Sequence, residues 1–512
     1  MLTRTRLRVY LGALLSGLAL GLAFDPFAFA PLVLVGVGYL TWLIHQRSMK
    51  EAFGIGYLAG LVLMTFNSAG VHTLGIWIAA VLIAFMALWI GLVAVLTKLL
   101  QNLPLWPLWV ACAWSAIEFL YSRIPLGGFG WARLAYTTLD TPIASYLPLI
   151  GAGGVSWMVA LLGALCAYFV IDTILWRRVT VVCLATIIVL GGVAASQRPL
   201  AQGGDLVTVG VVQGNVDGTS GAHAMGYARS VTNNHFSETI TMMARSQTGT
   251  IEGNTQLAPD FLLWPENSTD YDPNYDAQTY ERLMQTYEIS GLPILVGAIT
   301  RGPGEGERQT TAMWWTSDGE QVRYSKRNLV PFGEFTPFKS IIQRVFPITQ
   351  QVGSQSVPGE GPGVLPVQLP DGRDLKIGTI ICYELAFDST MYDVVKNGAD
   401  IVAVQSNNGT YLGTMQPSQQ FAITRVRALE FEREIVVSTT SGVSGLIGAR
   451  GEILDITNER ESASRSYSVP VRDGVSLGVR VGPIWELAST ILAVAVSVLA
   501  LMITFSTRIK LR

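Results

Sequence analysis

The pattern of apolar and polar residues divides the chain into a hydrophobic first part, a mixed middle part and a short hydrophobic end. Residues 1–197 hold seven long apolar runs with short breaks, several of which approach the ~20 residues that cross a bilayer. An eighth run at 484–505 precedes Arg508, Lys510 and Arg512. The pattern therefore predicts a membrane protein with eight spans. The first seven runs lie at about 9–23, 28–44, 53–69, 75–100, 105–120, 143–171 and 181–195.

The mixed middle part alternates short β-branched runs with turn residues and helical patterns. Strands that alternate with helices, together with hairpins, are typical of a layered α/β sandwich. We expect a seven-helix membrane domain at 1–197, one globular domain at 198–482, and a membrane helix with a short basic tail at 483–512. The expected elements of the globular domain are strands at 206–213, 260–264, 293–299, 376–381 and 400–405, hairpins at 311–324 and 435–454, and helices at 223–245, 275–290 and 416–433.

Basic residues in the short loops predict how the spans are oriented. The arginine-rich start, the breaks near Arg47, Lys98 and Arg178, and the basic end all face the cytoplasm if the N-terminus does. The positive-inside rule then places the globular domain outside the cytoplasm. Arg123 and Arg133 lie in an outer loop against this trend, and a structural role or a contact with lipid headgroups would explain them. The start could be a signal peptide, but a second run follows at once, which favours an uncleaved helix.

Composition narrows the classes of function. Of the 512 residues, 50% are hydrophobic and 14% are charged, and the formal net charge is −2. These values favour a membrane protein and give no indication of nucleic acid binding. The four cysteines form no disulfide framework, and the four histidines show no metal-ligand spacing. We therefore expect neither a metal site nor a cofactor.

The stretch at 375–385 contains the first candidate for chemistry. A β-branched run ends abruptly at Cys382, which predicts a buried strand followed by a tight turn into a helix. Such a turn presents the side chain at its tip and leaves nearby N–H groups free to hold an oxyanion. Cys382 is the only cysteine in the mixed middle part. Taken alone, it fits a nucleophile and a small buried apolar residue equally well.

Two further segments place ionisable side chains directly after predicted strands. Pro265 ends one strand and leaves Glu266 at its rim, and the segment 324–334 presents Lys326 and then Glu334 on a loop with Pro and Gly. A nucleophilic thiol needs a base that takes its proton, which a glutamate with a raised pKa can provide. A nearby lysine stabilises both the thiolate and the oxyanion. Each residue alone fits a solvated charge, but together they are the residue types of a thioester mechanism.

The order of three motifs resembles the nitrilase superfamily. These are Trp-Pro-Glu at 264–266, Tyr-x-Lys-x-x-Leu-Val-Pro-Phe-Gly-Glu at 324–334, and Cys-Tyr-Glu at 382–384. With seven spans before this domain and one after it, nearly the whole chain resembles the apolipoprotein N-acyltransferases. Weaker agreement lies at 24–27, 130–131 and 153–157. The resemblance implies a polytopic α-helical membrane domain joined to a nitrilase-like α/β domain, an αββα sandwich.

The resemblance also implies a role for each matching residue. Glu266 would be the general base, Lys326 would stabilise the oxyanion, and Cys382 would be the nucleophile. Three further residues would support this triad, by orienting the lysine, shaping the site and fixing the turn: Glu334, Tyr383 and Glu384.

The implied reaction is a ping-pong acyl transfer. Cys382 would take a fatty acyl group from a membrane phospholipid, and the α-amino group of a lipoprotein's diacylglyceryl-cysteine would then take it from the thioester. Both substrates are lipids, so the implied place is the bacterial cytoplasmic membrane, with both termini in the cytoplasm and the catalytic domain outside. We expect a monomer without a nucleic acid partner.

Three segments leave alternatives open. Residues 406–413 lack the tryptophan of an Asn-Asp-Ala-Trp-Phe-like string in the family, which leaves the acyl-donor preference open because that loop borders the lipid site in the family. The apolar residues of 335–362 fit a lid that enters the lipid or an ordinary core helix. The charges of helix 416–433 fit a solvated face or a set of ion pairs within the domain: Arg425, Arg427, Glu430 and Arg433.

Three rival functions follow from the same residues. A membrane-tethered amidase of the nitrilase superfamily would use the same triad, with water in place of the amine. A non-catalytic scaffold would have no reason to keep all three residue types. A coupled transporter would place more ionisable residues in its spans than Glu118 and Glu486.

Overall fold

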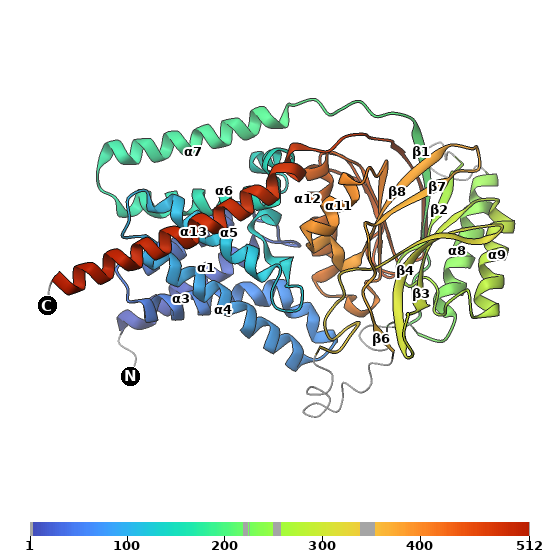
Figure 1. The fold of residues 1–512 in the computed structure, drawn as a ribbon, viewed down its shortest axis with the longest axis horizontal. Coiled ribbons are helices and arrows are strands. Elements are labelled where there is room, and N and C mark those ends of the chain that lie inside the picture. Colours follow the sequence, from blue (N-terminus) through green and yellow to red (C-terminus); the bar gives the residue numbers. More distant parts are fainter. Residues whose placement is uncertain (1–3, 219–223, 225, 249–257, 338–353, 511–512) are drawn as a thin grey trace. The chain divides into compact units, whose positions relative to one another are not determined.

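The computed structural model describes residues 4–218, 224, 226–248, 258–337 and 354–510 (Figure 1). The chain forms two compact units, which we call the helical unit and the α/β unit. The helical unit comprises Met1–Pro199 and Ser476–Arg512, and the α/β unit comprises Leu200–Val475.

The helices of the helical unit coincide with the predicted apolar runs. Five helices in the described residues are long and apolar enough to cross a membrane, and they include α3, α4, α6, α7 and α13; α2 is apolar but shorter. The α-helices of this unit are α1 (Arg4–Leu22), α2 (Pro31–Ile44), α3 (Met49–Ser68), α4 (Ile76–Leu100), α5 (Trp106–Tyr121), α6 (Leu147–Ile171), α7 (Leu175–Ser196) and α13 (Leu477–Lys510). Apolar side chains on every face of a helix require lipid or other helices around it, which is why these runs gather in one unit.

A buried cluster of charges joins α13 to the rest of the helical unit. Arg133 Nη2 lies 2.5 Å from Glu486 Oε1 on α13, and Arg123 Nη2 lies 2.8 Å from the other carboxylate oxygen. Arg133 Nε also lies 3.7 Å from Glu118 Oε2 on α5. The two arginines that oppose the positive-inside trend therefore have a structural role. Gly153 on α6 permits this approach, because a Cβ there would lie 3.2 Å from Glu486 Cβ.

Two sheets form the centre of the α/β unit. In the described residues the first sheet has the order β13-β1-β2-β3-β4-β5, with β6 paired to β4, and the second has the order β12-β11-β10-β9-β8-β7. The strands of the first sheet are β1 (Leu206–Gln213), β2 (Phe261–Leu263), β3 (Ile294–Arg301), β4 (Glu307–Thr316), β5 (Gly319–Ser325), β6 (Gln355–Ser356) and β13 (Ala463–Pro470). Those of the second are β7 (Val364–Gln368), β8 (Asp374–Ile381), β9 (Ile401–Ser406), β10 (Ile435–Thr439), β11 (Gly445–Ile447) and β12 (Ile453–Ile456).

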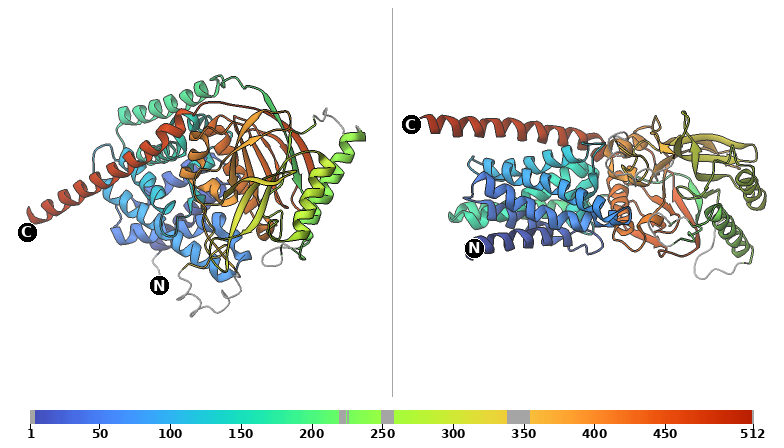
Figure 2. Two further views of the ribbon diagram at one scale, coloured as in Figure 1. Left: turned by 45° about the vertical axis from the view of Figure 1, so that its right-hand side comes forward. Right: turned by 90° about the horizontal axis from the view of Figure 1, so that it is seen from below.

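Helices cover the outer face of each sheet. α8 (Ser230–Thr248) and α9 (Ala277–Ser290) pack on each other and on the first sheet, whereas α11 (Asp388–Lys396) and α12 (Gln416–Phe431) lie against the second (Figure 1 and Figure 2). This arrangement is the expected αββα sandwich.

The alternation of side chains along β1 explains the layers. Val209 and Val211 join the core between the two sheets, whereas Val212 joins the core between the first sheet and its helices. Successive side chains of a strand point to opposite faces, so a strand buried on both faces reads as a continuous apolar run.

Some predicted elements were wrong in detail. The helix expected from residue 223 begins at Ser230. The segment expected to form a hairpin, 435–454, contains three strands in place of two: β10, β11 and the start of β12. β11 has only three residues, which is too short for a periodic signal. β7, β13 and α11 were not predicted; β13 carries three serines and an arginine among its eight residues. Most of the segment considered as a lid, 338–353, lies outside the described residues.

Candidate active site

Cys382 stands at the tip of a strained turn. β8 ends at Ile381, and a short 3₁₀ turn, η7 (Cys382–Ala386), follows directly and leads into α11. Cys382 has a φ of +52°, in the left-handed region that residues other than glycine seldom adopt. Backbone strain of this kind is found at functional sites, where the surrounding structure holds it in place. The predicted turn after the strand is therefore present.

Lys326 lies between two carboxylates. It follows β5, and its Nζ is 2.9 Å from Glu266 Oε1 and 2.8 Å from Glu334 Oε1. The side chains of Lys326 and Glu266 are only 1% and 3% exposed, so this is a buried ionic cluster. The second oxygen of Glu266 accepts a 2.8 Å hydrogen bond from the N–H of Asn407, just after β9. The structure thus brings together three residues that lie up to 68 positions apart, from Glu266 to Glu334.

The thiol of Cys382 belongs to the same cluster. Burial and the negative charge of Glu266 raise the pKa of this thiol to about 12, although Lys326 and a hydrogen bond to Ser406 act in the opposite direction. Cys382 is nevertheless partly exposed. At neutral pH the thiol therefore keeps its proton, and it needs a base at the moment of attack.

Burial and neighbouring charges shift the pKa values of Glu266 and Lys326. Burial raises the pKa of Glu266, the charge of Glu334 raises it further, and Lys326 offsets part of this effect. A carboxylate with a raised pKa is a better proton acceptor for a thiol. Burial acts to lower the pKa of Lys326, but the charges of Glu266 and Glu334 raise it well above its ordinary value. Lys326 therefore stays an ammonium.

The carboxylate of Glu384 holds the turn in place through hydrogen bonds to backbone N–H groups. Its Oε2 accepts a 2.9 Å hydrogen bond from the N–H of Ile381, and its Oε1 accepts one of 2.7 Å from the N–H of Arg327. The carboxylate thereby holds the end of β8 beside the segment that carries Lys326. Tyr383 packs its ring edge-on against Phe387 at 5.1 Å between centroids.

Helix α12 supports the turn with a buried arginine. Arg427 is fully buried, its Nη2 lies 2.6 Å from Asp388 Oδ1, and its Nη1 lies 2.7 Å from Glu430 Oε2. Its Nε donates a 3.1 Å hydrogen bond to the carbonyl of Leu385 in the turn. The sequence left open whether the charges of this helix form a solvated face or ion pairs within the domain. Arg427 and Glu430 form an ion pair within the domain.

Sequence reasoning gave no role to Ser406, whose hydroxyl acts to lower the pKa of the thiol, or to Asn407, whose N–H donates to Glu266. β8 and β9 are parallel, with Ile381 registered to Gln405. Cys382 follows β8 and Ser406 is the last residue of β9, so the two are neighbours at the end of the parallel pair. The parallel pairing of the two predicted strands was the signal that could have identified them, because carboxyl ends of parallel strands share one edge of the sheet.

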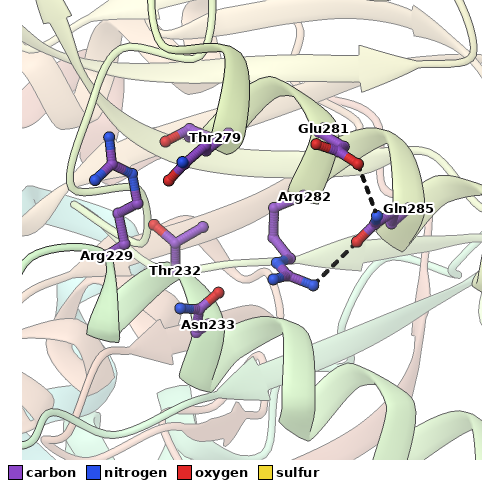
Figure 3. Close-up of a pocket in the computed structure, with 8 residues that line it drawn as sticks. Arg229, Thr232, Asn233, Thr279, Glu281, Arg282 and Gln285 are labelled. Atoms are coloured by element: carbon purple, nitrogen blue, oxygen red, sulfur yellow. Dashed lines mark hydrogen bonds between the residues drawn. The ribbon is translucent and has the colours of Figure 1, made fainter.

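A separate polar cavity lies between α8 and α9 (Figure 3). Its charged side chains already have partners: Arg282 donates to Gln285 at 3.0 Å, and Gln285 donates to Glu281 at 3.3 Å. Arg229 pairs with Asp276 at 2.7 Å. Its lining does not include Glu266, Lys326 or Cys382, so this cavity is separate from the cluster around Lys326.

Two protein families match the chain. Residues 16–165 match the apolipoprotein N-acyltransferase N-terminal domain, and residues 252–465 match the carbon-nitrogen hydrolase family. The chain is 30% identical over 515 residues to an apolipoprotein N-acyltransferase of Mycolicibacterium smegmatis, covering 95% of this chain and 84% of the relative. It is 25% identical to that of Vibrio cholerae, covering 88% of each chain. Among solved structures, a nitrilase-superfamily amidase of Nesterenkonia AN1 aligns with a TM-score of 0.38 at 15% identity, over 55% of this chain and 96% of its own.

Proposed function

The chain belongs to the apolipoprotein N-acyltransferase family, a family of bacterial membrane proteins that N-acylate lipoproteins, and we propose that Glu266, Lys326 and Cys382 are its catalytic triad. The observation that supports this proposal is the buried ammonium of Lys326, held 2.9 Å from Glu266 Oε1 in the cluster that includes the thiol. The three residues carry out a two-step acyl transfer. The acyl donor is a membrane phospholipid.

The first step forms a thioester on Cys382. Glu266 accepts the thiol proton while the sulfur attacks the carbonyl carbon of the phospholipid ester. The ammonium of Lys326 stabilises the oxyanion that develops on the carbonyl oxygen. The bond from the carbonyl carbon to the glycerol oxygen then breaks, and Glu266 returns its proton to that oxygen. A lysophospholipid leaves, and the acyl chain stays on the sulfur.

The second step transfers the acyl chain to the lipoprotein. The neutral α-amino group of the diacylglyceryl-cysteine attacks the thioester carbonyl, and Glu266 accepts a proton from that nitrogen. The carbon–sulfur bond breaks, and the proton returns from Glu266 to the sulfur of Cys382. An amide has formed, and the enzyme is regenerated.

Three supporting residues keep the triad aligned. Glu334 holds the second side of the Lys326 ammonium at 2.8 Å and accepts a 2.6 Å hydrogen bond from the N–H of Val330. Glu384 and Tyr383 fix the turn that carries the thiol.

The place of action is the bacterial cytoplasmic membrane. We infer that both termini face the cytoplasm and that the α/β unit lies outside, because the short loops with positive charge would then be internal. Every residue of the proposed triad comes from one chain, which supports action as a monomer.

Intact-protein mass spectrometry tests the triad directly. The purified protein is incubated with phospholipid but without acceptor, beside Cys382→Ala and the control Cys166→Ala, which removes a cysteine of α6. We expect a hydroxylamine-labile acyl adduct on the wild type and on the control, and none on Cys382→Ala. A diacylglyceryl-cysteine peptide should discharge it. Discharge by water at the same rate would indicate the amidase, and an adduct on Cys382→Ala would exclude this nucleophile.

A further inference from the structure

Ser406 lies directly beside the proposed nucleophile. It is the last residue of β9 and is fully buried. The register pairs Ile381 with Gln405, so the next residues, Cys382 and Ser406, are neighbours at the end of the parallel pair. Ser406 therefore lies next to the thiol, and its hydroxyl acts to lower the pKa of Cys382.

Two buried side-chain amides orient the hydroxyl of Ser406. Gln420 on α12 donates from Nε2 to Ser406 Oγ at 2.6 Å, and Gln420 Oε1 accepts from Asn408 Nδ2 at 2.6 Å. Gln420 and Asn408 are 5% and 2% exposed, so water does not replace these contacts. A serine hydroxyl has one proton to donate. Because Gln420 uses the oxygen as an acceptor, that proton is directed to the sulfur.

We propose that Ser406 is a further catalytic residue, whose hydroxyl donates a hydrogen bond to the sulfur of Cys382 and stabilises the negative charge that develops there. Gln420 and Asn408 are positioning residues that orient this hydroxyl. The inference rests on the proposed nucleophile. Ser406 forms and breaks no covalent bond, and its proton stays on the oxygen.

The charge balance of the cluster explains why a neutral donor is needed. The ammonium of Lys326 contacts two carboxylates, Glu266 and Glu334, so its positive charge is largely neutralised before any thiolate forms. A buried sulfur anion without a donor is costly. The hydroxyl of Ser406 supplies that donor when Cys382 loses its proton in the first step and when the sulfur leaves the thioester in the second.

The test measures the reactivity of the thiol apart from acyl transfer. The rate at which iodoacetamide alkylates Cys382 is followed against pH by peptide mass spectrometry, and the rate of acylation by phospholipid is measured in parallel. The variants are Ser406→Ala, Ser406→Thr and Gln420→Glu. The matched control is Ser464→Ala, which removes a buried serine hydroxyl of β13, on the other sheet, that donates to Glu238 of α8.

We expect Ser406→Ala to shift the alkylation profile of Cys382 to higher pH and to slow acylation about tenfold or more, as for loss of a hydrogen bond to a charged group. Ser406→Thr keeps the hydroxyl and should recover most of the rate. Gln420→Glu presents only acceptor oxygens, which draw the proton of Ser406 away from the sulfur, so it should behave like Ser406→Ala. Ser464→Ala should match the wild type.

Two results separate this inference from the proposed triad. An alkylation profile of folded Ser406→Ala that coincides with the wild type, while Cys382→Ala forms no adduct, overturns the role of Ser406 and leaves the triad intact. An acyl adduct on Cys382→Ala overturns the triad itself. If Ser406→Ala does not fold, the profile of Gln420→Glu decides, and an unchanged profile there rejects the orienting role and the donation to sulfur.

Discussion

The hydroxyl of Tyr324 donates a 2.7 Å hydrogen bond to Oε1 of Glu384, and this contact joins β5 to the turn after β8. Both side chains are buried. The same carboxylate also accepts from the backbone N–H groups of Ile381 and Arg327, at 2.9 Å and 2.7 Å. One side chain therefore holds in fixed positions the two segments that carry Lys326 and the thiol of the proposed triad.

Glu384→Gln should lower the free energy of unfolding more than Tyr324→Phe does. The amide of Gln would turn an NH₂ group toward buried N–H donors, so we expect a loss of about 2–4 kcal/mol in the free energy of unfolding. Tyr324→Phe removes one neutral donor and should cost about 1–2 kcal/mol. Unfolding of the purified proteins in detergent and the rate of thioester formation check both values. Equal losses for the two variants would contradict a central role of the carboxylate.

The rate of acylation should fall on the acid side as Glu266 takes up a proton. Burial and the charge of Glu334 raise the pKa of Glu266 above its ordinary 4.5, so the rate should already fall above that pH. Glu334→Gln removes the neighbouring negative charge and should move the acid limb of the profile to lower pH. Acylation rates between about pH 4 and 8 give the position of the limb. Glu360→Gln, at an exposed position, is the control. A limb that stays in place or moves to higher pH in Glu334→Gln would show that Glu334 does not act on the base.

His235 should make the stability of the α/β unit depend on pH. Its buried ring lies 5.6 Å from that of Trp264, and burial lowers its pKa from 6.5 to about 4. The unfolded chain binds a proton at this histidine near pH 6.5, whereas the folded chain does so only near pH 4. The stability present above pH 6.5 is therefore lost as the pH falls toward 4, by about 2 kcal/mol between pH 7 and pH 5.

Thermal unfolding of His235→Gln at these two pH values tests this origin. We expect the variant to lose less stability than the wild type on going from pH 7 to pH 5, because glutamine does not titrate. His72→Gln, which changes an exposed histidine, should keep the wild-type dependence. The same pH dependence in His235→Gln and the wild type would assign the effect to other groups.

Glu486→Leu should destabilise the helical unit. It removes the carboxylate that lies 2.5 Å from the buried guanidinium of Arg133, and loss of one partner of a buried ion pair typically costs about 3–5 kcal/mol. Arg123→Ala removes the partner of Glu486 whose side chain is 40% exposed, and it should cost about 1 kcal/mol or less. Thermal unfolding in nanodiscs compares the two variants. Similar small losses would indicate that the buried pair contributes little.

The motifs predicted much of the candidate site because each marks a local change in the chain. Glu266, Lys326 and Cys382 all follow strands, and Pro265 ends one of them. The apolar core of β8 indicated where the turn begins. The same reasoning could not separate a nucleophile from a buried apolar residue at Cys382, because that difference depends on what the fold places beside the thiol.

Apolar periodicity and short motifs are properties of neighbouring residues, so the sequence was enough to predict the long apolar helices, the α/β class and the residue types of the proposed triad. Which charges are buried and paired depends on how the helices and strands pack in three dimensions. Arg123 meets Glu486 from 363 positions away, and Arg427 reaches the carbonyl of Leu385 from 42 positions away. Ser406 acts on the pKa of the thiol because the parallel pairing of β8 and β9 makes it a neighbour of Cys382. Such contacts arise when strands and helices pack, and no local pattern records which partner a side chain will meet.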